Sequence, residues 1–150
     1  NLEKLGAKTM YLDVTDQATL DAAVEQIVKE QGRLDVVFAN AGYAQQGPLE
    51  CVDIEDAKAQ FDVNVFGFGR TIKAALPQMR KQKSGLVIVT SSAAGSVTMP
   101  AMAWYPATKH AIDALAGGLR MYRAISALHK KIDITRHFQV SFYLHQNRIF

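Results

Sequence analysis

Cysteine is almost absent from the sequence, and so are long apolar runs. The single cysteine, Cys51, has no second cysteine to pair with, so no internal disulfide can form and nothing indicates an oxidising compartment. No stretch approaches the roughly 18 consecutive apolar residues that a membrane-spanning helix needs, and no signal-like segment opens the chain. From these absences we expect a protein without a membrane span, located in the cytoplasm.

Charge of one sign is not concentrated anywhere in the chain. The net charge of +3 comes from dispersed residues. The densest basic group, Arg80, Lys81 and Lys83, falls at the expected end of a helix, where cations complement the helix dipole. The four histidines lack the cysteine, histidine or carboxylate neighbours at short spacing that are typical of a zinc site. We therefore expect neither a nucleic-acid partner nor a bound metal ion.

Strand-like and helix-like segments alternate along the chain. With 150 residues, 49% of them hydrophobic, the chain is long enough for one core and hardly for two, so we expect one domain over residues 1–150. The expected strands are residues 9–14, 34–39 and 85–91, and the expected helices are residues 16–32, 53–79 and 104–125. The alternation predicts an α/β fold with a parallel sheet, right-handed crossovers and helices on both faces.

Polar residues stand where two of the expected buried strands end. Asn40-Ala41-Gly42 follows the apolar run 36–38, and Ser91-Ser92 follows the apolar run 86–89. Open α/β sheets bind their ligands outside the carboxyl ends of the strands. We therefore expect a ligand site at this edge of the sheet.

Tyr105 and Lys109 are spaced as neighbours on one face of a helix. A phenol has an ordinary pKa of about 10, and lowering it to about 7 takes roughly 4 kcal/mol in favour of the phenolate. One positive charge about 5 Å away supplies roughly 3 kcal/mol at an effective dielectric constant of about 20, so a second cation is needed. Pro106 favours the first helical turn, which places Tyr105 near the start of its helix. An isolated pair of this kind often arises by chance on an amphipathic helix, and Ser92 upstream favours a functional role.

Five motifs in order and spacing carry a family resemblance. They are Leu12 to Asp16, Asn40 to Gly42, Asn64-Val65, Ser91-Ser92 and Tyr105 to Lys109. Over about residues 5 to 125 the chain resembles the short-chain dehydrogenases/reductases. The resemblance implies an incomplete Rossmann-like fold with three α/β/α layers, which binds NAD or NADP. It also implies an oxidoreductase that interconverts a small-molecule alcohol and a carbonyl by hydride transfer.

The resemblance also implies catalytic roles for four residues. Tyr105 is the general acid/base, and Ser92 orients the reacting oxygen. Lys109 lowers the pKa of the phenol and holds the nicotinamide ribose, so that Tyr105 and Lys109 also belong to the cofactor site. Asn64 holds a water molecule that links Lys109 to solvent. The alternative for Asn64 is an ordinary polar residue in a helix, which an otherwise apolar neighbourhood disfavours.

The remaining cofactor contacts are implied for the two loops that follow strands. Asp13 accepts a hydrogen bond from the adenine amino group with the backbone of Val14 nearby, and Asn40, Ala41 and Gly42 lie along the cofactor. The alternative for Asp13 is a turn or helix-capping aspartate, which would have no ligand.

Substrate and assembly are less clearly indicated. Met99, Met102 and Trp104 line an apolar substrate pocket or belong to the core, and the sequence leaves both open. Gly117-Gly118 marks either a soft spot in the last long helix or close packing against another helix. Members of the family often dimerise through this helix and the preceding long one, so we expect a homo-oligomer.

Two parts of the family pattern are missing. No glycine-rich turn between a strand and a helix is present, so the choice between NAD and NADP cannot be read. Lys131 to Thr135 fits a further strand, but the tail 126–150 is atypical because Arg136 to Phe150 contains neither proline nor glycine. We expect this chain to bind the cofactor weakly and to turn over little. The alternative is a catalytically silent scaffold or dimerisation module.

Overall fold

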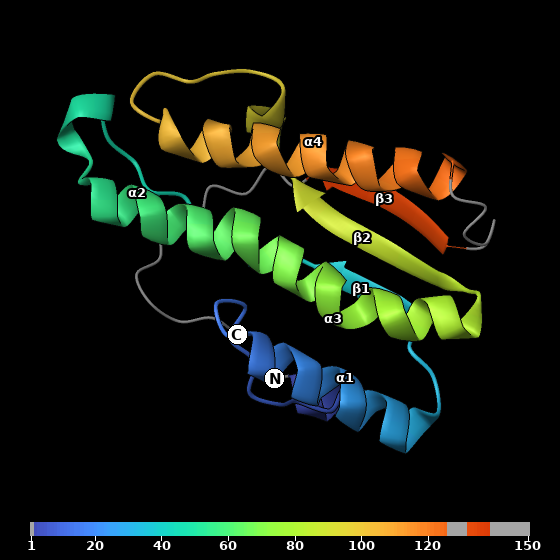
Figure 1. Ribbon diagram of the computed structural model, residues 1–150. Helices are drawn as coiled ribbons and strands as arrows, with labels where there is room; N and C mark the ends of the chain where they lie inside the picture. Colours follow the sequence, from blue (N-terminus) through green and yellow to red (C-terminus); the bar gives the residue numbers. More distant parts are fainter. Residues whose placement is uncertain (1, 126–131, 139–150) are drawn as a thin grey trace.

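The computed structural model describes residues 2–125 and 132–138 (Figure 1). In chain order the helices and strands are α1 (Gln17–Gln31), β1 (Val36–Ala39), α2 (Ile54–Phe61), α3 (Gly67–Gln82), β2 (Gly85–Ser91), α4 (Trp104–Ile125) and β3 (Ile132–Phe138). Short 3-10 turns span Leu2–Leu5, Leu49–Cys51 and Ala93–Gly95, and one π-helical turn spans Asp62–Phe66.

The three strands form a parallel sheet in the order β1-β2-β3. Val36 is in register with Leu86, and Gly85 is in register with Ile132. Parallel neighbours need a crossover, which the α2–α3 segment provides between β1 and β2 and which α4 provides between β2 and β3. The predicted Rossmann-like α/β fold, incomplete and with a parallel sheet, is confirmed.

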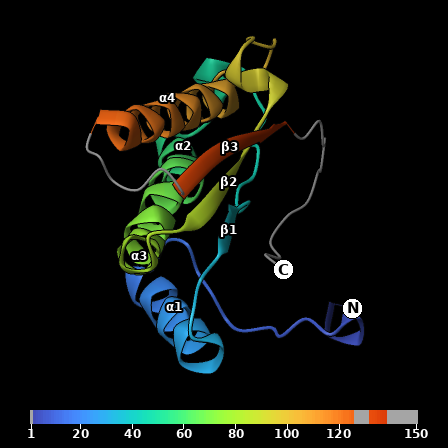
Figure 2. The same cartoon turned by 90° about the vertical axis from the view of Figure 1, so that its right-hand side faces the viewer.

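The described helices lie on one face of this sheet (Figure 2). On that face, Val87 and Val89 of β2 are 0% and 1% exposed. On the other face of the sheet, Val36 and Phe38 of β1 are 50% and 53% exposed. The described residues therefore form two of the three predicted layers, because no described helix covers the second face.

The core lies between the sheet and the helices α3 and α4. In α3 the buried side chains recur at the helical period, which places one face of the helix against β2. The core cluster consists of Leu34, Phe68, Ile72, Ala75, Met79, Val87, Val89, Ile112 and Ala116. This packing fixes β2 between the helices, with its carboxyl end beside the start of α4.

Two expected elements differ in the structure. Residues 9–14 are not a strand, because a strand needs a hydrogen-bonded neighbour and this segment has none among the described residues. The expected helix 53–79 is interrupted by the π-helical turn, which contains Asn64. Asp16 caps the start of α1, where its side chain accepts a hydrogen bond from the backbone N–H of Ala18.

The carboxyl-terminal region is described in part. β3 overlaps the strand that Lys131 to Thr135 suggested. The rest of the tail, residues 126–131 and 139–150, lies outside the described residues. No helix in the described part of the chain combines the length and the apolar character that crossing a membrane requires.

Candidate active site

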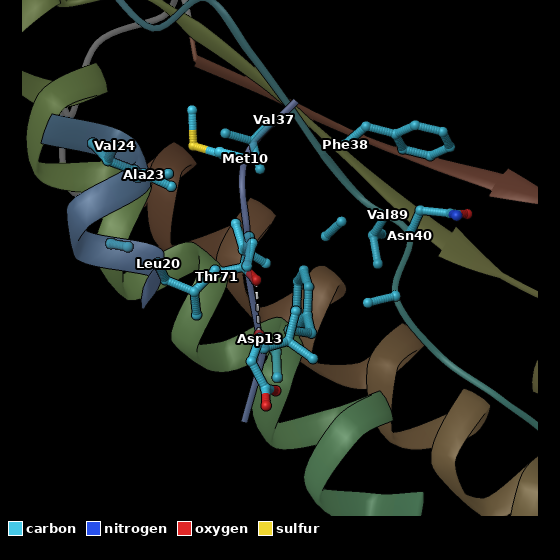
Figure 3. A pocket seen from close by; sticks show the side chains of 18 of the residues that line it. Met10, Asp13, Leu20, Ala23, Val24, Val37, Phe38, Asn40, Thr71 and Val89 are labelled. Atoms are coloured by element: carbon cyan, nitrogen blue, oxygen red, sulfur yellow. Dashed lines mark hydrogen bonds between the residues drawn. The ribbon is translucent and has the colours of Figure 1, made fainter. Parts of the chain in front are cut away.

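A cavity of about 1120 Å³ lies between the extended segment 9–14, β1, α1 and α3 (Figure 3). Its lining includes five of the nine predicted site residues: Asp13, Val14, Asn40, Ala41 and Asn64. Much of the remaining wall is apolar and comes from α1 and α3, including Leu20, Val24 and Phe68. The cavity therefore combines an apolar wall with the polar side chains of Asp13, Asn40 and Asn64. Its volume is slightly above the range of about 300–1000 Å³ that is common for ligand sites.

Asp13 is held in a tight turn before α1. Its Oδ1 accepts hydrogen bonds from the backbone N–H of Thr15 at 2.8 Å and from the Thr15 hydroxyl at 2.7 Å. These two bonds hold the pKa of Asp13 below its usual value, and the bond from the backbone N–H of Thr15 has the larger effect. Asp13 is therefore a turn aspartate, and its ionised carboxylate can also accept a hydrogen bond from a ligand.

Lys109 is buried beside Tyr105 at the start of α4. Its side chain is 4% exposed, and its Nζ donates a hydrogen bond to the backbone carbonyl of Thr90 at 3.1 Å. The Nζ lies 5.6 Å from the centre of the Tyr105 ring. Burial lowers the pKa of Lys109 to about 8, and the charge of Asp113, one helical turn further on, opposes this shift. The helical spacing thus brings the predicted pair together.

Ser92 lies directly after β2 and caps the 3-10 turn that follows. Its Oγ accepts a hydrogen bond from the backbone N–H of Ala94 at 3.1 Å. The turn packs on α4, since a Cβ on Gly95 would lie 3.3 Å from the backbone carbonyl of Lys109. This contact brings the turn that follows Ser92 up to the helix that carries Tyr105 and Lys109.

Asn64 joins three segments through its side-chain amide. Its Oδ1 accepts from the backbone N–H of Tyr43 at 2.9 Å, and its Nδ2 donates to the Tyr43 carbonyl at 2.8 Å. The Nδ2 also donates to Thr108 Oγ1 at 3.1 Å. Both amide hydrogens are therefore used, which leaves only the second lone pair of Oδ1 to hold the water molecule expected from the sequence.

Gly42 fits closely against Asn64 and Lys109. A Cβ at this position would lie 2.9 Å from Asn64 Oδ1 and 3.9 Å from Lys109 Nζ. The loop after β1 can approach Asn64 this closely only because residue 42 has no side chain, whereas the distance to Lys109 is an ordinary van der Waals contact. Gly42 thereby connects the cavity-lining residues Asn40 and Ala41 to the Tyr105–Lys109 pair.

Replacing Gly42 with alanine is expected to lower the free energy of unfolding by about 1–3 kcal/mol, because the added methyl group overpacks the contact with Asn64. The control is Gly69→Ala, since Gly69 is a helical glycine with nothing within 4 Å of its Cβ position. That variant should gain about 0.5–1 kcal/mol. Urea unfolding of both variants measures the difference, and equal stability would contradict the expected clash.

Three buried polar residues at the site were not predicted. Gln60 donates from Nε2 to the Tyr43 carbonyl at 3.2 Å, and Thr108 donates to the Tyr105 carbonyl at 2.7 Å. Thr90 donates from its hydroxyl to Asn40 Oδ1 at 2.7 Å. Gln60 stands four positions before Asn64 and Thr108 lies inside the Tyr105–Lys109 motif, so spacing alone could have drawn attention to both.

The proposed apolar substrate residues lie outside the cavity lining. The ring of Trp104 meets Phe61 edge to face, with 6.3 Å between ring centroids. Met102 forms an isolated backbone bridge with Gly47. In the described part of the chain no group of three or more histidine, cysteine, aspartate or glutamate side chains could hold a metal ion.

Comparison with known proteins identifies one family. A family profile described as short chain dehydrogenase matches residues 1–130. A 3-ketodihydrosphingosine reductase from Bacteroides thetaiotaomicron is 38% identical over 120 residues, which cover 79% of this chain and 45% of that protein. The chain thus spans about half the length of the curated relatives it matches.

Solved structures agree with this match. A short-chain dehydrogenase/reductase from Burkholderia phymatum in complex with NAD has a TM-score of 0.81 and 26% identity, covering 91% of this chain and 49% of that chain. ElxO with NADP bound has a TM-score of 0.78 and 32% identity, covering 85% of this chain and 51% of that chain.

Proposed function

The chain belongs to the short-chain dehydrogenase family, and from this we propose that it carries the catalytic part of an NAD(P)-dependent oxidoreductase. The proposed reaction interconverts an alcohol and a carbonyl. The observation that carries the proposal is the buried Lys109 ammonium beside Tyr105, next to a cavity lined by Asp13, Asn40 and Asn64. Perturbed, buried charges beside a cavity are a common mark of catalytic sites.

The residues around the cavity fit NAD or NADP. The ionised Asp13 carboxylate suits an amino group, and the apolar wall suits an aromatic base. Val14, Asn40, Ala41 and Gly42 would lie along the cofactor. The bound forms of the two structural relatives support the same cofactor class. When bound, the cofactor supplies or takes the hydride.

The protein side chains would handle the proton. During reduction the Tyr105 hydroxyl gives its proton to the carbonyl oxygen, which the Ser92 hydroxyl orients. The Lys109 ammonium attracts the negative charge that develops on the phenol oxygen. One of the three N–H groups of the ammonium donates to the Thr90 carbonyl. The other two are available for the ribose and for a water molecule at Asn64.

Binding and turnover test this proposal with NADH and NADPH as probes. Trp104, the single tryptophan in the sequence, precedes Tyr105 and reports on the site through its fluorescence. We expect weak, saturable binding and slow reduction of a carbonyl substrate. Tyr105→Phe should keep the binding and lower turnover by roughly 100- to 10,000-fold. A chain that binds neither nucleotide would instead fit a catalytically silent scaffold.

We also propose that the chain forms a homo-oligomer through its long helices. Leu115 and Met121 of α4 are exposed, as is Phe66 beside α3. Exposed apolar side chains on long helices suit a helical interface. Sedimentation of the chain at several concentrations measures the assembly, and a monomer throughout would contradict it.

A further inference from the structure

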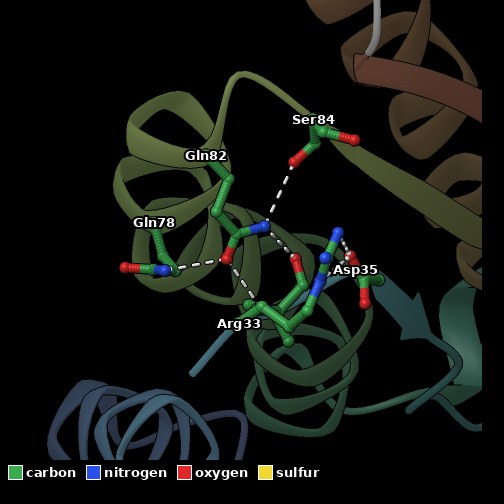
Figure 4. A network of polar contacts seen from close by, with 6 residues as sticks. Arg33, Asp35, Gln78, Gln82 and Ser84 are labelled. Carbon is green, nitrogen blue, oxygen red and sulfur yellow. Dashed lines mark hydrogen bonds and ion pairs between the residues drawn. The ribbon is translucent and has the colours of Figure 1, made fainter. Parts of the chain in front are cut away.

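Amide side chains from one long helical segment hold the chain on both sides of β1. Before β1, Gln82 Oε1 accepts from the backbone N–H of Leu34 at 2.7 Å, and Gln82 Nε2 donates to the Leu34 carbonyl at 2.9 Å (Figure 4). Gln78 supports this contact by donating to Gln82 Oε1 at 2.7 Å. Leu34 is thereby tied to the end of α3 through both of its backbone polar groups.

After β1, an amide side chain bonds both backbone groups of Tyr43 in the same way, and a second amide bonds its carbonyl. Asn64 bonds both backbone groups of Tyr43, and Gln60 donates a second hydrogen bond to the same carbonyl. A backbone carbonyl accepts two hydrogen bonds, so these two amides saturate it. Gln60 stands at the end of α2, four positions before Asn64 in the π-helical turn.

Gln60 is costly to bury. Its side chain is 0% exposed, and its Oε1 has no hydrogen-bond partner among the described residues. An unsatisfied buried acceptor costs about 1–3 kcal/mol, which an apolar side chain of the same shape would avoid. Packing alone therefore does not explain a glutamine here, whereas the hydrogen bond from Nε2 to the Tyr43 carbonyl does.

We propose that Gln60 is a positioning residue of the active site, which acts through the Tyr43 carbonyl to hold the loop 40–43. This inference rests on the proposed oxidoreductase function and adds to it a residue outside the family motifs quoted above. Gly42 precedes Tyr43 and lies against both Asn64 and Lys109, while Asn40 and Ala41 line the cavity. Gln60 thus keeps the cofactor-lining loop in contact with the catalytic lysine.

The hydrogen exchange of single backbone amides tests the contact without any ligand. Gln60→Met keeps the length and most of the volume of the side chain but removes the donor. We expect the protection factor of the Tyr43 amide to fall by about tenfold or more, which corresponds to the loss of one hydrogen bond. Gln82→Met is the matched control, because it removes the equivalent clamp on Leu34 and should leave the Tyr43 amide unchanged.

Gln60→Glu supplies a second test of the hydrogen bond to the Tyr43 carbonyl. A protonated carboxyl can donate to the Tyr43 carbonyl, whereas a carboxylate cannot. We expect Tyr43 protection close to that of the unaltered protein at low pH and a loss of protection as the carboxyl ionises. If Gln60→Met does not fold, this titration decides alone, and protection that does not change with pH overturns the proposal.

Cofactor affinity completes the test, with NADPH as the probe. We expect Gln60→Met to weaken NADPH binding by about tenfold and Gln82→Met to leave it unchanged. If the unaltered chain binds only NADH, NADH replaces NADPH in this comparison. If it binds neither nucleotide, the proposed function fails, while amide exchange still decides whether Gln60 holds Tyr43. The positioning role is overturned if Tyr43 keeps its protection in Gln60→Met, or if protection falls and NADPH affinity does not.

Discussion

Replacing Asn64 with alanine is expected to lower the free energy of unfolding by about 3 kcal/mol or more. The variant loses three hydrogen bonds at a side chain that is 1% exposed, and it leaves the part-buried backbone groups of Tyr43 with fewer partners. Each buried polar group left unsatisfied costs about 1–3 kcal/mol. For a chain of this size, such a loss lowers Tm by roughly 10 °C, which thermal unfolding measures.

Asn40→Ala provides the control for this prediction. Asn40 is also an asparagine beside the cavity, but it is exposed, and its Oδ1 accepts a hydrogen bond from the Thr90 hydroxyl. We expect its removal to cost about 1 kcal/mol or less. Similar losses of stability in the two variants would show that the clamp on Tyr43 contributes little.

Replacing Lys109 with methionine is expected to remove a pH dependence from the stability of the protein. Lys109 has a pKa of about 8 in the folded state, against 10.5 as its ordinary value. Below about pH 8 the lysine is charged in both states, so burial of the charge costs the folded state about 3 kcal/mol. Between these values the unfolded state binds more protons, and therefore the stability of the unaltered protein rises with pH.

The difference between the two proteins isolates this effect from all other titrating groups. Urea unfolding at about pH 7 and about pH 10 should show the unaltered protein gaining roughly 2.5 kcal/mol relative to Lys109→Met. Asp113→Asn should begin the rise at a lower pH, because the Asp113 charge raises the pKa of Lys109. If the difference in unfolding free energy stays constant across this pH range, burial does not lower the pKa of Lys109 in the folded protein.

The sequence predicted best those elements whose pattern is long and local. Residues 85–91 and 104–125 form β2 and α4 as expected, because a buried strand is marked by a continuous apolar run and an amphipathic helix by apolar residues at helical spacing. The segment 9–14 has a strand-like pattern but no strand. A strand forms only beside a hydrogen-bonded neighbour, and the residue pattern of one segment does not show whether such a neighbour is present.

In the candidate site, too, local contacts were predicted from the sequence and long-range contacts were not. The contact of Tyr105 with Lys109 follows from helical spacing, and it was predicted. The bonds from Gln60 and Asn64 to Tyr43 were not, because they join residues 17 and 21 positions apart through a loop backbone. A polar residue inside an apolar helix indicates that a partner exists, but it does not identify the partner.

The register of the sheet has a consequence for how the molecule folds. Val36 pairs with Leu86 fifty positions later, and Gly85 pairs with Ile132 forty-seven positions later. Closing a flexible loop of about fifty residues costs roughly 3.5 kcal/mol in chain entropy, beyond a constant term. Neither pairing can therefore form early as an isolated pair of strands. The sheet acquires its register only when α3 and α4 pack on it and shorten the loops, so the strands and their helices form a single cooperative unit.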